Sequence, residues 1–339
     1  LLEENTELRK CFYPMEARRR NLTYDSPLFV DINVKYFEND KFISSEKFNR
    51  ILIARIPIML GSDKCHLKDC SKSEKIRKGE CEFDEGGYFI INGKERVLIT
   101  QIRTIYNKVL VFSQKSNSKY KFVSEIRSMS TETGHSVLFK TLIGRDEKSF
   151  YFSLPYIKDI QEIGIVFKAL GYVEETQIKN IIGIYTDDFK KYLKIIIRDS
   201  FFIKTQKEAL IHIGNSSIHT IKENECESYA KQVVETELFP HLGITATNKE
   251  KAMFLGHVCK KTFLTFLGYR KEDDRDNYIN KRVETSGILL FDLFRTLWKR
   301  YSSIIKQQIE KKKQKPDILS IISRLNLITL GIRYSFSTG

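Results

Sequence analysis

The chain has 339 residues, is 41% hydrophobic and 12% aromatic, and carries a net charge of +14 from 57 lysines and arginines against 43 aspartates and glutamates. This length exceeds one ordinary core, which predicts two domains, and the apolar content excludes an intrinsically disordered chain. The positive balance favours polyanions, nucleic acid first, and no apolar stretch is long enough to span a bilayer.

The first predicted elements are strands. Residues 28–36 alternate apolar and polar side chains, the pattern of a half-buried strand, and residues 51–60 form an apolar run typical of a buried strand. The runs 88–91 and 94–99 flank Asn92-Gly93, which predicts a type I′ hairpin because both turn positions need positive φ.

The middle of the chain changes from strand-like to helical patterns. Short β-rich runs between residues 109 and 154 predict an antiparallel meander. Helical spacing then follows, and the longest apolar stripe includes Trp298, which is interpreted as core and not as a nucleotide-stacking platform. The predicted helices are 187–198, 225–239, 249–267, a long one around 290–305 that stops before Lys315-Pro316, and a short one at 318–327.

Three segments carry distinctive motifs in a fixed order. They read PMEARRRNLTYDSPLFV at 14–30, IPIMLGSDKC at 56–65 with CEFDEGGYFIINGKERVLITQ at 81–101, and DDRDNYINKRVETSGILLFDLF at 273–294. Together they resemble the second-largest subunit of eukaryotic-type multisubunit DNA-directed RNA polymerases, closest to the RNA polymerase II type. Gly61 and the run 285–288 depart from the family's pattern, which leaves a nuclear enzyme and one encoded by a large DNA virus both open. The lack of an initial Met indicates an excerpt from a longer chain.

The resemblance implies an α+β fold with a discontinuous outer domain, the protrusion, at 1–103 and 283–339. A mixed β-meander and helical domain, the lobe, would be inserted at 104–282. Both would form part of the wall of the DNA cleft and a docking surface for transcription factors. The implied partners are the largest and smaller polymerase subunits, the template and non-template DNA strands, the RNA–DNA hybrid and initiation factors, without a membrane. The expected location is the nucleus for a cellular chain and the cytoplasm or virion for a viral one, and not outside the cell.

No catalytic, cofactor-binding or metal-binding residue is predicted in the chain. The family's nucleotidyltransferase activity uses Mg²⁺ held mainly by the largest subunit. Asp273, Asp274 and Asp276 could form a nuclease-like metal site, but a solvated loop with counter-charges from Arg275, Lys281 and Arg282 is favoured. Zinc at Cys65, His66, Cys70 and Cys81 is disfavoured because paired Cys-x2-Cys spacing is missing.

The functional prediction is therefore electrostatic. Lysines and arginines of a cleft wall would contact phosphates and place the duplex without reading bases. The alternative for each is an ordinary solvated charge, and for Arg18–Arg20 an internal ion pair with Glu16. Two other functions stay open, a stand-alone basic nucleic-acid-binding protein and a metal-dependent nuclease. The candidate phosphate contacts are Lys94, Arg96, Arg103, Lys281, Arg282 and Arg333.

Overall fold

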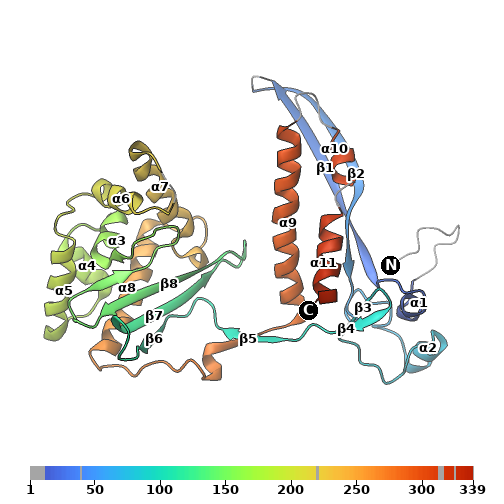
Figure 1. The fold of residues 1–339 in the computed structure, drawn as a ribbon, viewed down its shortest axis with the longest axis horizontal. Helices are drawn as coiled ribbons and strands as arrows, with labels where there is room; N and C mark the ends of the chain where they lie inside the picture. The colour runs from blue at the N-terminus through green and yellow to red at the C-terminus, as the bar shows by residue number, and fades with distance from the viewer. Residues whose placement is uncertain (1–11, 39, 219–220, 312–316, 324–325, 339) are drawn as a thin grey trace. The chain divides into compact units, whose positions relative to one another are not determined.

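The computed structural model describes residues 12–38, 40–218, 221–311, 317–323 and 326–338, and it divides the chain into two units (Figure 1). Unit 1 combines Leu1–Ile102 with Val283–Gly339, and unit 2 is Arg103–Arg282. Unit 1 is therefore discontinuous in sequence, and unit 2 is inserted into it. Each unit has hydrophobic clusters of its own.

Unit 1 is built around a long antiparallel hairpin. Strand β1 (Asp25–Glu38) pairs with β2 (Lys41–Pro57), from Asp25 opposite Pro57 to Glu38 opposite Lys41. Helices α9 (Ser286–Glu310), α10 (Ile318–Ser323) and α11 (Leu327–Thr338) lie beside it (Figure 1). The strand predicted at 28–36 is confirmed within β1, and the one predicted at 51–60 is confirmed as far as Pro57, where β2 ends. The sequence did not predict residues 41–50 of β2, because most of them are exposed and they contain no continuous apolar run.

The core of unit 1 joins the hairpin to the helices. Ile53 of β2 and Tyr301 of α9 are buried in one cluster with Phe336 of α11. Phe336 also packs on Phe89, with the ring centroids 4.8 Å apart. The apolar stripe of α9 faces this cluster as predicted, through Leu293, Leu297 and Tyr301. The interpretation of Trp298 as core is wrong, because its side chain is 39% exposed and stacks on Tyr301 outside the cluster. The predicted stop at Lys315-Pro316 lies outside the described residues.

A smaller substructure of unit 1 contains the sequence's central motif. It includes α1 (Pro14–Arg19), α2 (Lys72–Arg77), β3 (Phe89–Ile91) and β4 (Lys94–Arg96). Strands β3 and β4 pair antiparallel with Ile91 opposite Lys94, so the Asn92-Gly93 hairpin is confirmed. Its own cluster buries Ala17, Tyr24 and Leu60.

Unit 2 contains a five-stranded sheet in the order β10-β9-β8-β7-β6. Sequence neighbours are sheet neighbours and all pairs are antiparallel, so the predicted meander is confirmed. The strands are β6 (Leu110–Ser113), β7 (Tyr120–Met129), β8 (Ser136–Gly144), β9 (Phe150–Phe152) and β10 (Gln161–Glu162).

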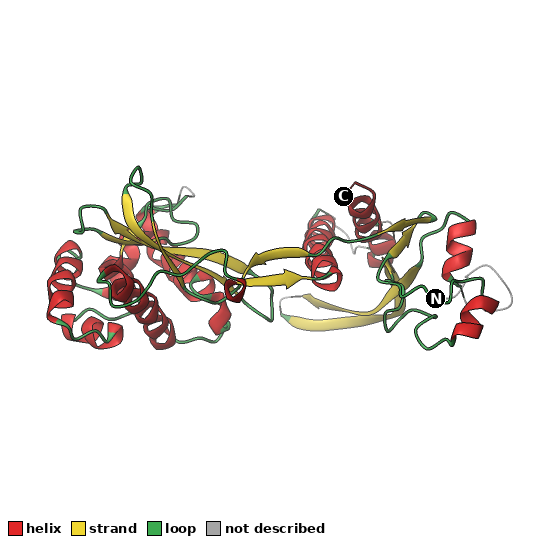
Figure 2. Cartoon of the chain, turned by 90° about the horizontal axis from the view of Figure 1, so that it is seen from below, coloured by secondary structure: helices red, strands yellow, loops and turns green. Residues whose placement is uncertain are grey.

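Helices pack on this sheet to form the main core of unit 2. They are α3 (Ile163–Ala169), α4 (Glu175–Ile182), α5 (Asp187–Asp199), α6 (Gln206–Asn215), α7 (Cys226–Gln232), which continues as a π-helical turn at Val233–Glu237, and α8 (Asn248–Phe266). Helix α8 contacts β6, β7 and β8, and Phe266 meets Phe122 edge to face at 5.9 Å. Figure 2 shows the helices of this unit, in red, against its strands, in yellow. Three of these helices were predicted, near 187–198, 225–239 and 249–267.

The chain passes from unit 1 into unit 2 through β5 (Gln101–Thr104) and returns through β11 (Lys281–Glu284). These two strands form a two-stranded sheet. Separate antiparallel sheets and helical segments make the fold α+β, as the sequence predicts. Among the described residues, no helix has the length and apolar character needed to cross a bilayer.

Candidate functional site

The Asn92-Gly93 turn positions the first two candidate cations. Both turn residues have positive φ, 50° at Asn92 and 75° at Gly93, as a type I′ turn requires. The turn packs closely on the chain after α1, because the Gly93 N–H donates to the Leu22 carbonyl at 2.8 Å. A Cβ added at Gly93 would lie 2.8 Å from the Asn21 Cα, so a side chain there has no room. The tip of the β3–β4 hairpin is therefore fixed.

Strand β4 presents its three residues to different surroundings. Lys94 is exposed, and among the described residues it has no ion-pair partner. Glu95 pairs with the Arg18 guanidinium at 2.8 Å. Arg96 is half-buried opposite Phe89 in the hairpin register. Lys94 is thus the cation of this strand that the described fold leaves exposed and without an ion pair.

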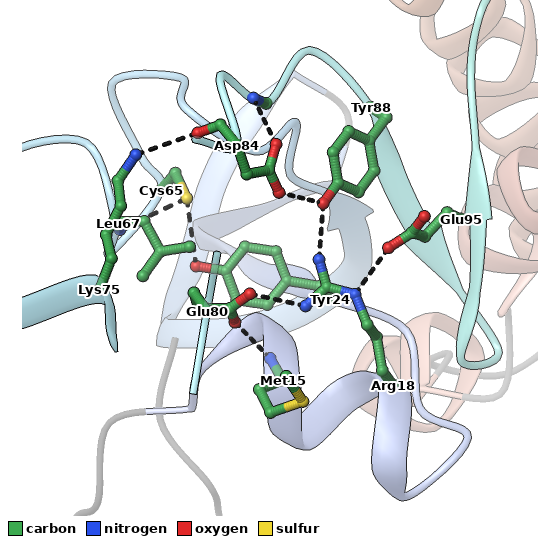
Figure 3. Close-up of polar contacts among 11 residues, drawn as sticks. Met15, Arg18, Tyr24, Cys65, Leu67, Lys75, Glu80, Asp84, Tyr88 and Glu95 are labelled. Carbon is green, nitrogen blue, oxygen red and sulfur yellow. Dashed lines mark hydrogen bonds and ion pairs between the residues drawn. The ribbon is translucent and has the colours of Figure 1, made fainter. Parts of the chain in front are cut away.

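Arg18 joins helix α1 to the loops before β3 and to β4 (Figure 3). Its guanidinium donates to Glu80 at 2.8 Å, to Glu95 at 2.8 Å and to the Tyr88 hydroxyl at 2.6 Å. Burial opposes the charged form, but the bonds to the two carboxylates raise the pKa of Arg18 above its usual value. The expected pair of Arg18 with Glu16 is wrong, because its partners lie 62 and 77 residues away in sequence.

Two cysteines near Arg18, Cys65 and Cys70, contact different side chains. Cys65 is buried, with its Sγ 3.7 Å from the Tyr24 hydroxyl (Figure 3). Cys70 Sγ accepts from Lys78 Nζ at 2.9 Å. Burial raises the pKa of Tyr24 above its usual value. Over the ranges that the structure describes, no group of three or more His, Cys, Asp or Glu side chains could hold a metal ion.

A second group of candidates lies within unit 2. Arg103 lies on β5, and Lys281 and Arg282 lie on β11, so the structure brings these three onto one two-stranded sheet. Lys281 Nζ pairs with Asp276 at 3.3 Å. The Arg282 guanidinium lies over the Tyr106 ring, 3.0 Å from its centroid. Lys281 and Arg282 are half-buried, and Arg103 is exposed.

The acidic segment after α8 is held by ion pairs. Asp273 accepts the Val111 N–H at 2.9 Å and contacts Arg270 and Lys261. Burial favours the neutral acid, but these donors hold the pKa of Asp273 below its ordinary value.

The counter-charges of this segment only partly match those expected. Lys281 pairs with Asp276 as predicted. Arg275 pairs with Glu125 at 3.2 Å, and its guanidinium lies 3.9 Å from the Phe112 ring centroid. Asp273 and Asp276 are thus bound to different cations, an arrangement that suits a loop held by ion pairs.

Arg333 has a structural partner. Its guanidinium pairs with Asp25 Oδ2 at 3.1 Å, and Arg55 binds Oδ1 of the same carboxylate at 3.1 Å. Asp25 is buried, so this triad links β1, β2 and α11. Arg333 lies apart in sequence and element from the hairpin pair and from the β5–β11 group, and we assign it first to the fold.

Two buried lysines, Lys168 and Lys251, were not predicted from the sequence. Lys168 Nζ donates to the carbonyls of Ser200 and Ile203, and Lys251 Nζ donates to those of Val234 and Glu235. Burial lowers the pKa of both lysines. For Lys168 the available signal was a lysine inside the apolar run 163–169, whereas Lys251 stands beside Lys249 and Glu250 and gave no such signal. The acceptors of both lysines are backbone carbonyls of other segments, which cannot be predicted from the sequence.

The chain is similar to known proteins over its whole length. A family model described as RNA polymerase beta subunit matches residues 2–330. The chain is 34% identical to DNA-directed RNA polymerase II subunit 2 of Arabidopsis thaliana, over 100% of this chain and 30% of that protein. It is 35% identical to a probable RPB2 homologue of Invertebrate iridescent virus 6, over 100% and 31%. It is 32% identical to the polymerase subunit Rpo2N of Methanocaldococcus jannaschii, over 96% and 66%.

Proposed function

The chain belongs to the RNA polymerase beta subunit family, and on that premise we propose that it forms the N-terminal, non-catalytic part of the second-largest subunit of a DNA-directed RNA polymerase. The match over residues 2–330 is the observation that carries this proposal. The chain spans about three tenths of the length of the plant and viral relatives. The nucleotidyltransferase activity is proposed for the assembled enzyme, with Mg²⁺ held mainly by the largest subunit.

Unit 1 is proposed to be the protrusion and unit 2 the lobe, both in the wall of the DNA cleft. The support is that unit 2 is inserted between two segments of unit 1, the order that the family resemblance implies. Template and non-template strands, the RNA–DNA hybrid, the other subunits and initiation factors are the proposed partners. The relatives include plant and viral proteins, so the proposed compartment is the nucleus for a cellular enzyme and the cytoplasm or virion for a viral one.

The wall is proposed to hold DNA through phosphate contacts. Lys94 and Arg103 support this best because both are exposed, one on a fixed hairpin and one on a paired strand. Lys281 and Arg282 lie on the strand beside Arg103 and add charge to the same sheet. Such contacts add affinity without base specificity and weaken as salt rises.

The test is the salt dependence of DNA binding by the assembled polymerase. Lys94→Ala and Arg103→Ala should each reduce the slope of log K against log salt by about 0.9, the value for one lost phosphate contact on duplex DNA. Lys190→Ala is the matched control, since that lysine pairs with Asp187 on the helix surface. If both variants keep the wild-type slope, the phosphate contacts are not at these residues.

A further inference from the structure

A groove of about 920 Å³ runs along strand β2 in unit 1. Six consecutive residues of β2, from Arg50 to Arg55, line one side. Side chains on a strand alternate between its two faces, so a run of six lining residues means that the groove follows the edge of the strand. Helices α10 and α11 supply the other side through Leu319, Ile322 and Leu330.

The backbone of β2 is paired on one side. In the described part of the chain, β1 and β2 form a two-stranded sheet, so the other edge of β2 has no partner strand. At one end of that edge, the Arg55 N–H donates to the Thr329 hydroxyl of α11 at 2.9 Å. An open edge presents a row of backbone donors and acceptors that an extended peptide can satisfy.

The side chains of the groove combine apolar surface with positive charge. Leu330 is 61% exposed and Leu52 is 39% exposed, both in the lining. Three arginines line the groove, Arg50 at one end of the β2 segment and Arg55 with Arg333 at the other, against one lining carboxylate, Asp317. Asp25, outside the lining, binds Arg55 and Arg333.

One polar atom of the lining has no partner. The Nε of Arg333 is buried and, among the described residues, donates to no acceptor. The apolar walls argue against a duplex, which would bring phosphates against Leu52 and Leu330. An acidic peptide with apolar residues between its charges suits both the walls and the arginines.

We propose that this groove, the β2 edge groove, binds an acidic, extended segment of a partner protein, which adds as a strand to the edge of β2 opposite β1. From Arg50 to Arg55 the strand spans about 17 Å, so the peptide needs acidic residues some five positions apart with β-branched residues between them. The inference rests on the proposed function for the kind of partner, a factor that docks on the polymerase.

The experiment measures peptide binding by the 339-residue chain through fluorescence anisotropy. The probe is a fluorescein-labelled peptide Asp-Val-Thr-Val-Thr-Glu, flanked by glycines. A second probe carries N-methyl groups on alternate residues, which removes the backbone donors of one edge but keeps charge and composition. A third replaces both acidic residues by lysine.

The first probe should bind, and the N-methylated and lysine probes should bind at least about tenfold more weakly, since strand addition loses hydrogen bonds or charge complementarity. Leu330→Glu should weaken the first probe by a similar factor. Leu138→Glu, at another exposed leucine, on β8 in unit 2, should leave binding unchanged.

Equal binding of the N-methylated peptide would overturn strand addition, and failure of the acidic probe to bind would overturn the site. Displacement of the peptide by a short DNA duplex, with duplex binding lost in Leu330→Glu, would make the groove a nucleic-acid site and refute the proposal. The two experiments can fail independently. If the proposed function is wrong, the salt slope of DNA binding by the assembled enzyme stays unchanged in the variants, while the acidic peptide still binds this chain.

Discussion

The neighbouring glycines 86 and 87 allow the cost of a steric clash to be separated from the cost of backbone strain. Both have positive φ, 82° at Gly86 and 85° at Gly87, so alanine at either position should cost about 1 kcal/mol of backbone strain. Their surroundings differ. A Cβ added at Gly86 would lie 2.4 Å from the Leu60 carbonyl oxygen, whereas no atom of the described chain lies within 4 Å of one added at Gly87.

The carbonyl that Gly86→Ala would displace cannot move freely. Leu60 is buried in the cluster around Tyr24, and its carbonyl accepts the Gly87 N–H at 2.9 Å. Losing that hydrogen bond costs about 1 kcal/mol, and forcing the packed segment apart adds about 1–2 kcal/mol. We therefore expect Gly86→Ala to lower the free energy of unfolding by about 3–4 kcal/mol and Gly87→Ala by about 1 kcal/mol.

The assay needs a local probe because the two units can unfold separately. Cys65 provides one, since it is 6% exposed and packs in the same cluster as Leu60. Alkylation of Cys65, followed by mass spectrometry during a urea titration, reports the stability of this substructure. Gly87→Ala serves as the matched control for backbone strain. Equal midpoints for the two variants would refute the steric account.

Three further predictions concern buried or half-buried polar groups. Glu80→Gln should lower the free energy of unfolding of unit 1 by about 2–3 kcal/mol, because the Glu80 side chain is 3% exposed and pairs with Arg18. Glu95→Gln is the control in the same urea titration, and it should cost about 0.5 kcal/mol or less because the Glu95 side chain is 56% exposed. Lys251→Met should destabilise unit 2 by about 1–3 kcal/mol by leaving two buried carbonyls without their donor, measured by helical circular dichroism. Burial lowers the pKa of His241, so the folded state disfavours its charged form; the free energy of unfolding should fall as pH drops below about 6.5, and His241→Gln should flatten that dependence.

Local patterns predicted the elements that bury one face and leave the other in water. The β3–β4 turn was predictable because Asn92-Gly93 needs only its own backbone conformation to form. Helix α9 was predictable because its apolar residues repeat on one side. Helix α3 was not, since all of its residues from Ile163 to Ala169 are buried and no polar face marks its period. The outer part of β2 was missed for the opposite reason, because most of residues 41–50 are exposed on both faces.

The ion-pair partners of the candidate residues were the hardest feature of the site to predict, because most of them are distant in sequence. Arg18 sits in a basic run next to Glu16, and adjacency suggested a pair between them. In the fold, residue 18 is on a helix beside the loop of Glu80 and the strand of Glu95, and its guanidinium donates to both carboxylates at 2.8 Å. The choice between such partners depends on tertiary packing that spacing in the sequence does not encode.

Tertiary ion pairs also reduce the number of cations in the net charge that are candidates for binding DNA. A balance of +14 counts every cation alike, but many of them are used inside the fold. Arg333 neutralises buried Asp25, and Lys251 caps buried carbonyls, so removing either should change stability before it changes affinity for a polyanion. Lys94 differs because it is exposed on a fixed turn and, within the described residues, pairs with no carboxylate. The proposed contact with phosphate therefore suits cations that the fold positions but does not itself use, and by that criterion Lys94 is a better candidate than Arg333.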